Sequence, residues 1–223
     1  MFFVDGFAKD EIMEKLLEFF YGIQDEDLLR DAHTFSKSCV PYCEVAISGE
    51  EDTIVGQILS GVWAVFVDGM DQCVLIDQRT YPQRTTSEPD QDKSFRGSRD
   101  GFVETMVFNA ALIRRRIRSP RLCVEHLEVG ETSRTDVAVC YFEGRADPEL
   151  VNTVRERIAQ ARVDALTMNQ ESLAELLVRK RWYNPFPKFK FTERPDAAAA
   201  QILEGDVVVL VDNSASALLL PTT

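Results

Sequence analysis

The feature that most constrains this 223-residue chain is an internal repeat. Seven of the thirteen residues from Gln57 to Gly69 are identical to those found 144 positions later. An earlier match, between Gly6 and Gly144, has an offset of 138, so about six residues were gained between the two matches. Ordered matches of this kind are typical of a duplicated structural unit. The alternative is convergent patterning, since glycine after a strand is common in any α/β fold.

Each copy predicts an α/β unit. In the first copy, apolar runs predict strands at 2–4, 40–47, 62–67 and 73–76, and helical spacing of apolar residues predicts helices at 10–20 and 50–59. The dipeptide Asp68-Gly69 between two apolar runs indicates a hairpin. Right-handed crossovers would make the helix-linked strands parallel neighbours, with the hairpin as an antiparallel edge. We therefore predict an α/β fold with two similar subdomains, each a mixed β-sheet with helices.

The second copy has an additional strand at 122–129 with no counterpart before Phe2, so the first copy is expected to be truncated at Met1. Between the copies, residues 81–92 are polar and rich in turn formers, which predicts a surface linker. An amphipathic pattern then runs from 101 to 118 and ends before Pro120. We expect an N-terminal subdomain at 1–84, a linker and bridging Arg-rich helix at 85–120, and a C-terminal subdomain at 121–223.

Charge and hydropathy exclude several classes of protein. The formal charge is −12, whereas a nucleic-acid surface needs a basic footprint. There is neither a secretion signal at the start nor a run of about 20 apolar residues, so the polypeptide as given is expected to be soluble. The five cysteines are an odd number scattered among apolar residues, which favours free thiols in a reducing compartment.

Seven arginines lie between positions 96 and 121 of this otherwise acidic chain. We take six of them as a candidate docking surface for an acidic partner or a neighbouring subunit, because guanidinium groups bind carboxylates in a bidentate manner. The six are Arg96, Arg99, Arg114, Arg115, Arg116 and Arg118. The alternative is a structural one, in which positive charge in a last helical turn favours the helix dipole.

Four acidic residues follow apolar runs at equivalent places in the two copies: Asp5, Asp68, Glu143 and Asp212. Open α/β sheets bind ligands beyond the ends of their strands, so these side chains are candidates for a ligand cleft. The alternative is that they cap turns or helix starts.

The sequence predicts no catalytic residue, no metal site and no cofactor. It has no nucleophile elbow, no phosphate-binding glycine loop and no dinucleotide fingerprint. Cys39 and Cys43 are separated by three residues and have no second pair, so zinc would lack ligands. The two histidines, His33 and His126, suit packing or surface roles. An enzyme is therefore the class we rank last.

Several segments resemble the GerA family of spore germination A subunits. They are FRGSRDGFVET at 95–105, NAALIRRRIR at 109–118, RTDVA at 134–138, WYNPFP at 182–187, TERPD at 192–196 and LEG at 203–205. Two further segments, 108–112 and 166–173, resemble one branch of that family more than its nutrient-receptor subunits.

The resemblance implies a membrane protein of endospore-forming bacteria, whose soluble region precedes a transmembrane domain in the inner spore membrane. It implies a part in ion release during germination, as an oligomeric channel. In the full-length protein we expect additional sequence before Phe3, a transmembrane domain after Thr223, and a cytosolic or core-facing position for these residues. The expected partners are further copies of the chain and other germination membrane subunits. A small-ligand sensor with a pocket between the subdomains is the alternative function.

Overall fold

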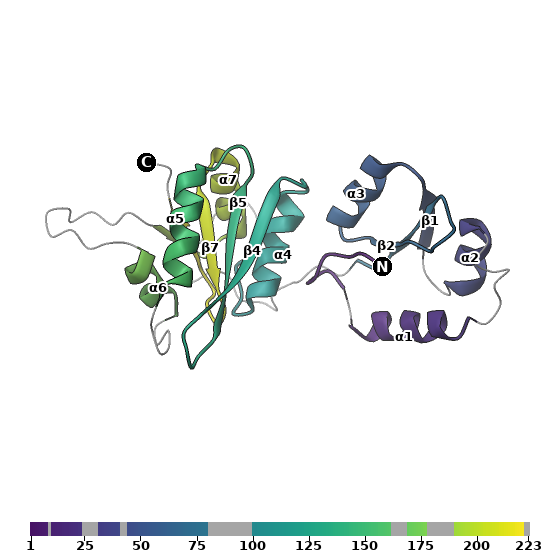
Figure 1. The fold of residues 1–223 in the computed structure, drawn as a ribbon, viewed down its shortest axis with the longest axis horizontal. Coiled ribbons are helices and arrows are strands. Elements are labelled where there is room, and N and C mark those ends of the chain that lie inside the picture. Colours follow the sequence, from purple (N-terminus) through teal and green to yellow (C-terminus); the bar gives the residue numbers. More distant parts are fainter. Residues whose placement is uncertain are drawn as a thin grey trace, which may run out of the picture. The chain divides into compact units, whose positions relative to one another are not determined.

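The computed structural model describes residues 1–8, 10–23, 31–40, 44–79, 100–161, 169–177 and 190–220. The chain divides into two compact units, one made of residues 1–82 with 118–120, and the other of 83–117 with 121–223. Each unit combines one β-sheet with helices, as Figure 1 shows for each separately. The predicted α/β class with two subdomains is confirmed.

In the first unit a three-stranded sheet has helices on both faces (Figure 1). Its elements are α1 (Asp10–Tyr21), α2 (Ala32–Cys39), β1 (Glu44–Ser48), α3 (Glu51–Leu59), β2 (Trp63–Val65) and β3 (Cys73–Asp77). Alternate residues of a strand face opposite sides. Trp63 and Val65 accordingly pack with α1 and α2, whereas Ala64 packs with α3. Helix α2 was not predicted from the sequence.

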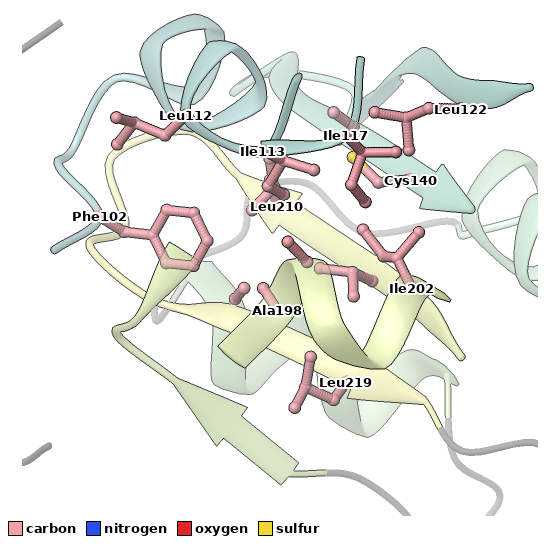
Figure 2. Close-up of a cluster of buried hydrophobic side chains, with 14 of the residues drawn as sticks. Phe102, Leu112, Ile113, Ile117, Leu122, Cys140, Ala198, Ile202, Leu210 and Leu219 are labelled. Atoms are coloured by element: carbon pink, nitrogen blue, oxygen red, sulfur yellow. The ribbon is translucent and has the colours of Figure 1, made fainter. Parts of the chain in front are cut away.

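In the second unit a five-stranded sheet of order β4-β5-β7-β8-β6 lies between two pairs of helices. Its elements are α4 (Met106–Arg116), β4 (Leu122–Val129), β5 (Thr135–Phe142), α5 (Pro148–Ala159), α6 (Asn169–Leu177), β6 (Lys190–Thr192), α7 (Pro195–Glu204), β7 (Val207–Val211) and β8 (Ala217–Leu220). Helices α4 and α7 cover one face and share the core drawn in Figure 2. Helices α5 and α6 cover the other.

The prediction of parallel neighbouring strands is wrong, because every strand pair among the described residues is antiparallel. The strands joined by a helix, β1 with β2 and β6 with β7, do run parallel to each other. They are not neighbours, however, because β3 and β8 are inserted between them. The second strand of each hairpin, β3 or β8, therefore lies between the two helix-linked strands and not at an edge of the sheet.

The structure confirms the repeat position by position. Helix α5 lies 138 residues after α1, and the strand registers coincide at an offset of 144, except that Phe2 matches at 138. The equivalent pairs are Ser48–Cys73 with Thr192–Ala217, Val65–Val74 with Val209–Leu218, and Phe2–Ala64 with Cys140–Val208. Gly6 and Gly144 both have a φ of 82°, a left-handed conformation that suits glycine.

The Arg-rich helix belongs to the core of the second unit. The sequence predicts a helix from 101 to 118 within a separate bridging segment, but α4 begins at Met106. Its Leu112 and Ile113 are buried against the sheet and α7 (Figure 2). Phe102, which precedes α4, is fully buried in the same cluster.

Replacing Gly56 in α3 by alanine is expected to raise the free energy of unfolding by about 0.5–1 kcal/mol, because glycine is a poor helix former. Gly56 is exposed, and a Cβ atom there meets nothing within 4 Å. Urea denaturation measures the change. Gly61→Ala is the control, since Gly61 has a φ of +100° and a Cβ atom there would lie 3.0 Å from Phe7 Cδ2. That variant loses stability, and an equal loss in Gly56→Ala would contradict the prediction.

Candidate functional site

Asp212 is one of the four acidic residues expected to follow strands, and it caps α4. Thr105 stands at the N-cap position of that helix but makes no side-chain capping bond. In its place, Asp212 Oδ1 accepts a hydrogen bond of 3.1 Å from the backbone N–H of Met106. A carboxylate satisfies an otherwise unpaired N–H group at this end of a helix and favours its dipole. The residue after β7 therefore fixes where α4 begins.

Asn109 strengthens this junction from inside α4. Its side chain is fully buried, and its Oδ1 accepts a bond of 2.8 Å from the N–H of Val103. Its Nδ2 donates to the carbonyl oxygens of Val103 at 2.6 Å and Ser214 at 3.4 Å. The buried amide therefore joins the segment that leads into α4 to the turn between β7 and β8, residues 212–216.

Gln170 of α6 contacts the same turn. Its side chain is buried, and its Nε2 donates to the carbonyl oxygen of Ser216 at 2.9 Å. Its Oε1 accepts hydrogen bonds from the hydroxyl groups of Ser214 and Ser216. We call residues 212–216 the clamped turn, because α4 and α6 both hold it by buried amide side chains.

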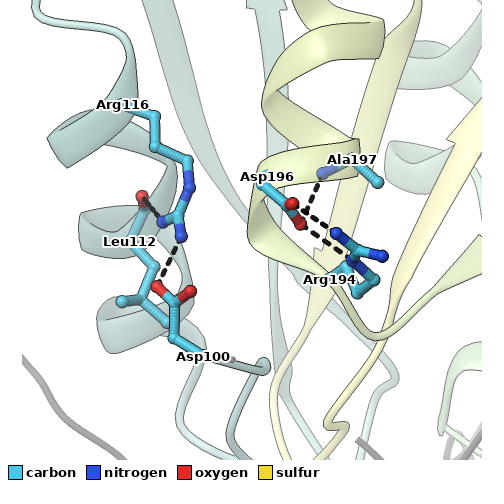
Figure 3. Close-up of polar contacts among 6 residues, drawn as sticks. All are labelled: Asp100, Leu112, Arg116, Arg194, Asp196 and Ala197. Carbon is cyan, nitrogen blue, oxygen red and sulfur yellow. Dashed lines mark hydrogen bonds and ion pairs between the residues drawn. The ribbon is translucent and has the colours of Figure 1, made fainter. Parts of the chain in front are cut away.

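A second polar group lies between α4 and α7 and is drawn in Figure 3. Arg116, in the last turn of α4, forms an ion pair with Asp100 and donates to the carbonyl oxygen of Leu112 at 2.9 Å. Arg194 forms an ion pair with Asp196 at the start of α7. The hydrogen bonds from Arg194 lower the pKa of Asp196, and the charge of Arg116 adds to this effect.

The arginines expected to form a docking surface have several different environments. Arg96 and Arg99 lie outside the described residues. Arg114 donates to the carbonyl oxygen of Leu122 at 2.9 Å, and burial lowers its pKa. Arg115 is partly exposed and Arg118 is exposed. Arg114 and Arg116 therefore have roles within the second unit, and docking by the cluster stays a prediction.

The other three acidic candidates have no such capping role. Asp5 is exposed and its Oδ1 accepts a hydrogen bond of 2.8 Å from the N–H of Gly6, which is a turn contact. Asp68 is exposed in the turn after β2. Glu143 is exposed, and its backbone N–H donates to the carbonyl oxygen of Arg121 at 2.8 Å. A ligand cleft formed by the four acids stays a prediction.

The sequence correctly drew attention to the segments that hold Asn109 and Gln170, but it did not identify these residues as functional candidates. The signal in the sequence that could have identified them was the resemblance of these segments to a known family. In the part of the chain that the structure describes, no group of three or more His, Cys, Asp or Glu residues is placed to hold a metal ion.

Four cysteines are described and all are free: Cys39, Cys73, Cys123 and Cys140. Burial raises the pKa of the Cys140 thiol to about 12, so it remains protonated at neutral pH. Cys43 lies outside the described residues. Among the helices in the described ranges, none is long and apolar enough to cross a membrane.

Comparison with solved structures shows that this two-unit fold has a counterpart of known structure. The N-terminal domain of the A subunit of the Bacillus megaterium spore germinant receptor GerK3 superimposes with a TM-score of 0.67. The two sequences are 24% identical, and the alignment covers 97% of this chain and 78% of that one. The match shows that the fold is shared with a germinant receptor domain.

The family itself is shown by sequence. The family model described as Bacillus/Clostridium GerA spore germination protein matches residues 1–223, and the chain belongs to this family. Stage V sporulation protein AF of Bacillus subtilis (strain 168), the branch indicated by residues 108–112 and 166–173, is 50% identical over 172 residues. That alignment covers 77% of this chain and 35% of the relative.

Spore germination protein KA of the same organism is 30% identical over 89% of this chain and 37% of its own length. This chain therefore spans little more than a third of these two relatives.

Replacing Asn109 by leucine is expected to lower the free energy of unfolding by about 2–4 kcal/mol, because the buried backbone groups of Val103 lose their partner. Chemical denaturation measures the loss. Asn152→Leu, on the exposed side of α5, is the matched control; it removes one exposed hydrogen bond from Arg155 and lowers stability by no more than about 1 kcal/mol. Equal effects of the two substitutions would mean that the Asn109 bonds do not stabilise the junction.

Proposed function

We propose that these residues form a non-catalytic interaction domain of a germination protein of the spore inner membrane. The domain acts in the assembly or regulation of a membrane complex that releases ions during germination. Membership of the GerA family supports the germination role. The membrane complex, its oligomeric state and its ion release belong to the proposal, since the chain spans only part of its relatives.

The observation that carries this proposal is the set of contacts made by the segments that resemble the GerA family. In a catalytic site, such segments would bring a nucleophile, base or metal ligand together in a cavity. Here the described parts of 95–105, 109–118, 166–173 and 192–196 contribute Asp100, Asn109, Arg116, Gln170 and Asp196. These side chains bond to one another or to the backbone beside α4, in α7 and in the clamped turn. Such bonds fix the relative positions of helices and sheet, which suits a domain that presents a surface of defined shape.

The Arg-rich segment is the proposed docking surface for an acidic neighbour. Guanidinium groups recognise carboxylates by paired hydrogen bonds, and the rest of the chain is strongly acidic. A second copy therefore offers abundant carboxylates to this segment. Because Arg114 and Arg116 stabilise their own unit, a test by substitution has to avoid them.

Replacing Arg115 and Arg118 together by glutamine in the full-length protein is expected to reduce crosslinked assemblies several-fold, because two docking charges are removed. Chemical crosslinking followed by gel analysis in membranes measures the effect. Lys15→Gln removes an exposed positive charge from α1 and leaves assembly unchanged. Unchanged crosslinking in the double variant would refute docking by this segment.

The alternative is a small-ligand sensor that uses Asp5, Asp68, Glu143 and Asp212. A ligand that binds only the native state raises its stability by mass action. A thermal-shift screen with amino acids, sugars, nucleotides and divalent cations is expected to show such a rise, and Asp5→Asn is expected to reduce it. The absence of any shift would remove the support for a sensor.

A further inference from the structure

An apolar groove of about 490 Å³ lies on the α3 side of the sheet in the first unit. Its apolar lining comes from the N-terminal segment, α3, the end of β2 and the start of β3. Besides Met70, the apolar residues are these six: Phe2, Ile54, Val55, Ile58, Phe66 and Cys73. The rings of Phe2 and Phe66 meet edge to face at 5.5 Å, yet these residues are 60% and 51% exposed. Large aromatic side chains this exposed and adjacent are typical of an interaction site.

The internal repeat shows what covers the equivalent surface of the second unit. At the repeat offsets, the six lining residues correspond to Cys140, Ala198, Ala199, Ile202, Leu210 and Ala217. All six are buried in one cluster with Phe102, Met106, Leu112, Ile113 and Ile117, which lie on or beside α4 (Figure 2). Cys140 and Leu210, the counterparts of Phe2 and Phe66, are fully buried. The groove is thus the counterpart, in the first unit, of the surface that α4 covers in the second.

The polar contacts of α4 also have counterparts in the first unit. Asp68 corresponds to Asp212, which caps the first residue of α4, and Asp68 is exposed in the turn after β2. Gly49 corresponds to Glu193, whose carbonyl oxygen accepts a hydrogen bond of 2.9 Å from the N–H of Phe102. The described lining contains two acidic residues, Glu51 and Asp71, and no basic one. Negative charge here favours the N-terminal end of a helix.

We propose that this groove holds an amphipathic helix of the α4 type, carried by polypeptide that precedes Phe2 in the full-length protein. In the second unit, α4 begins about 34 residues before Cys140 and is joined to it through β4 and β5. Phe2 pairs with Ala64 as Cys140 pairs with Val208. Phe2 therefore takes the place of Cys140 in β5, and in the second unit the polypeptide that leads into this strand carries β4 and α4.

The groove also defines how the helix differs from α4. Ile54 and Val55 stand where the second unit has Ala198 and Ala199, so the floor of the groove is raised along α3. In a close-packed interface, larger side chains on one surface require smaller side chains on the surface that faces it. The incoming helix accordingly presents smaller side chains to α3 than α4 presents to α7. Its first turn lies over Asp68, which caps it.

The test is cysteine labelling of the full-length protein with a maleimide reagent, read by mass spectrometry of the labelled peptides. With Phe66→Cys, position 66 is expected to react at least about tenfold more slowly than Tyr21→Cys, at a site that is 86% exposed. Val55→Cys on α3 reports the same protection independently of any change that the loss of Phe66 causes. Labelling at positions 55 and 66 within about threefold of position 21 would overturn the proposal.

Two further variants identify the occupant. The first is a truncated variant that begins at Met1 and therefore lacks the covering segment. In this variant, labelling at position 66 is expected to become fast. Asp68→Asn weakens the cap and raises labelling, whereas Asp52→Asn, at an exposed site of α3 outside the groove lining, leaves it slow. Protection that persists in protein beginning at Met1 assigns the groove to another segment or another chain, and protection that requires other germination proteins assigns it to a partner. Either result overturns the proposal.

Discussion

The insertion of a hairpin strand between two helix-linked strands determines the architecture of both units. Strand β8 pairs with β6 on one side and β7 on the other, and β3 pairs in the same way with β1 and β2. A central strand with helices over both faces is buried throughout, and all four residues of β8 are buried. This strand determines the positions of the helices. It also determines the positions of the cap at Asp212 and of the turn that Gln170 holds.

The repeat made much of this fold predictable. The strands at 122–129 and 73–76, the helix at 10–20 and the α/β class of both units follow from apolar periodicity, and each is present in the structure. Strand order did not follow, because a run such as 207–211 is equally apolar beside a parallel or an antiparallel neighbour. The strand order depends on whether the second strand of the hairpin pairs at the edge of the sheet or between the two helix-linked strands. Contacts between residues far apart in sequence determine this.

The candidate site was predictable only in part, for a related reason. Asp212 was identified by its position after a strand, but its partner Met106 lies 106 residues away in sequence. Asn109 and Gln170 look like ordinary polar residues on amphipathic helices, and only the folded chain shows that both are buried against one turn. Spacing predicts which face of a helix is buried, whereas it does not reveal which backbone groups that face will meet.

The pairing of β8 on both sides has a mechanical consequence. Hydrogen bonds in an antiparallel sheet lie perpendicular to the strands, so a pull along β8 loads the bonds to β6 and β7 in shear and all at once. Such a strand resists extension far better than one whose bonds open singly, as in a zipper. The clamped turn directly precedes β8, so a displacement along β8 acts on this turn and, through its bonds with Asn109 and Gln170, on α4 and α6.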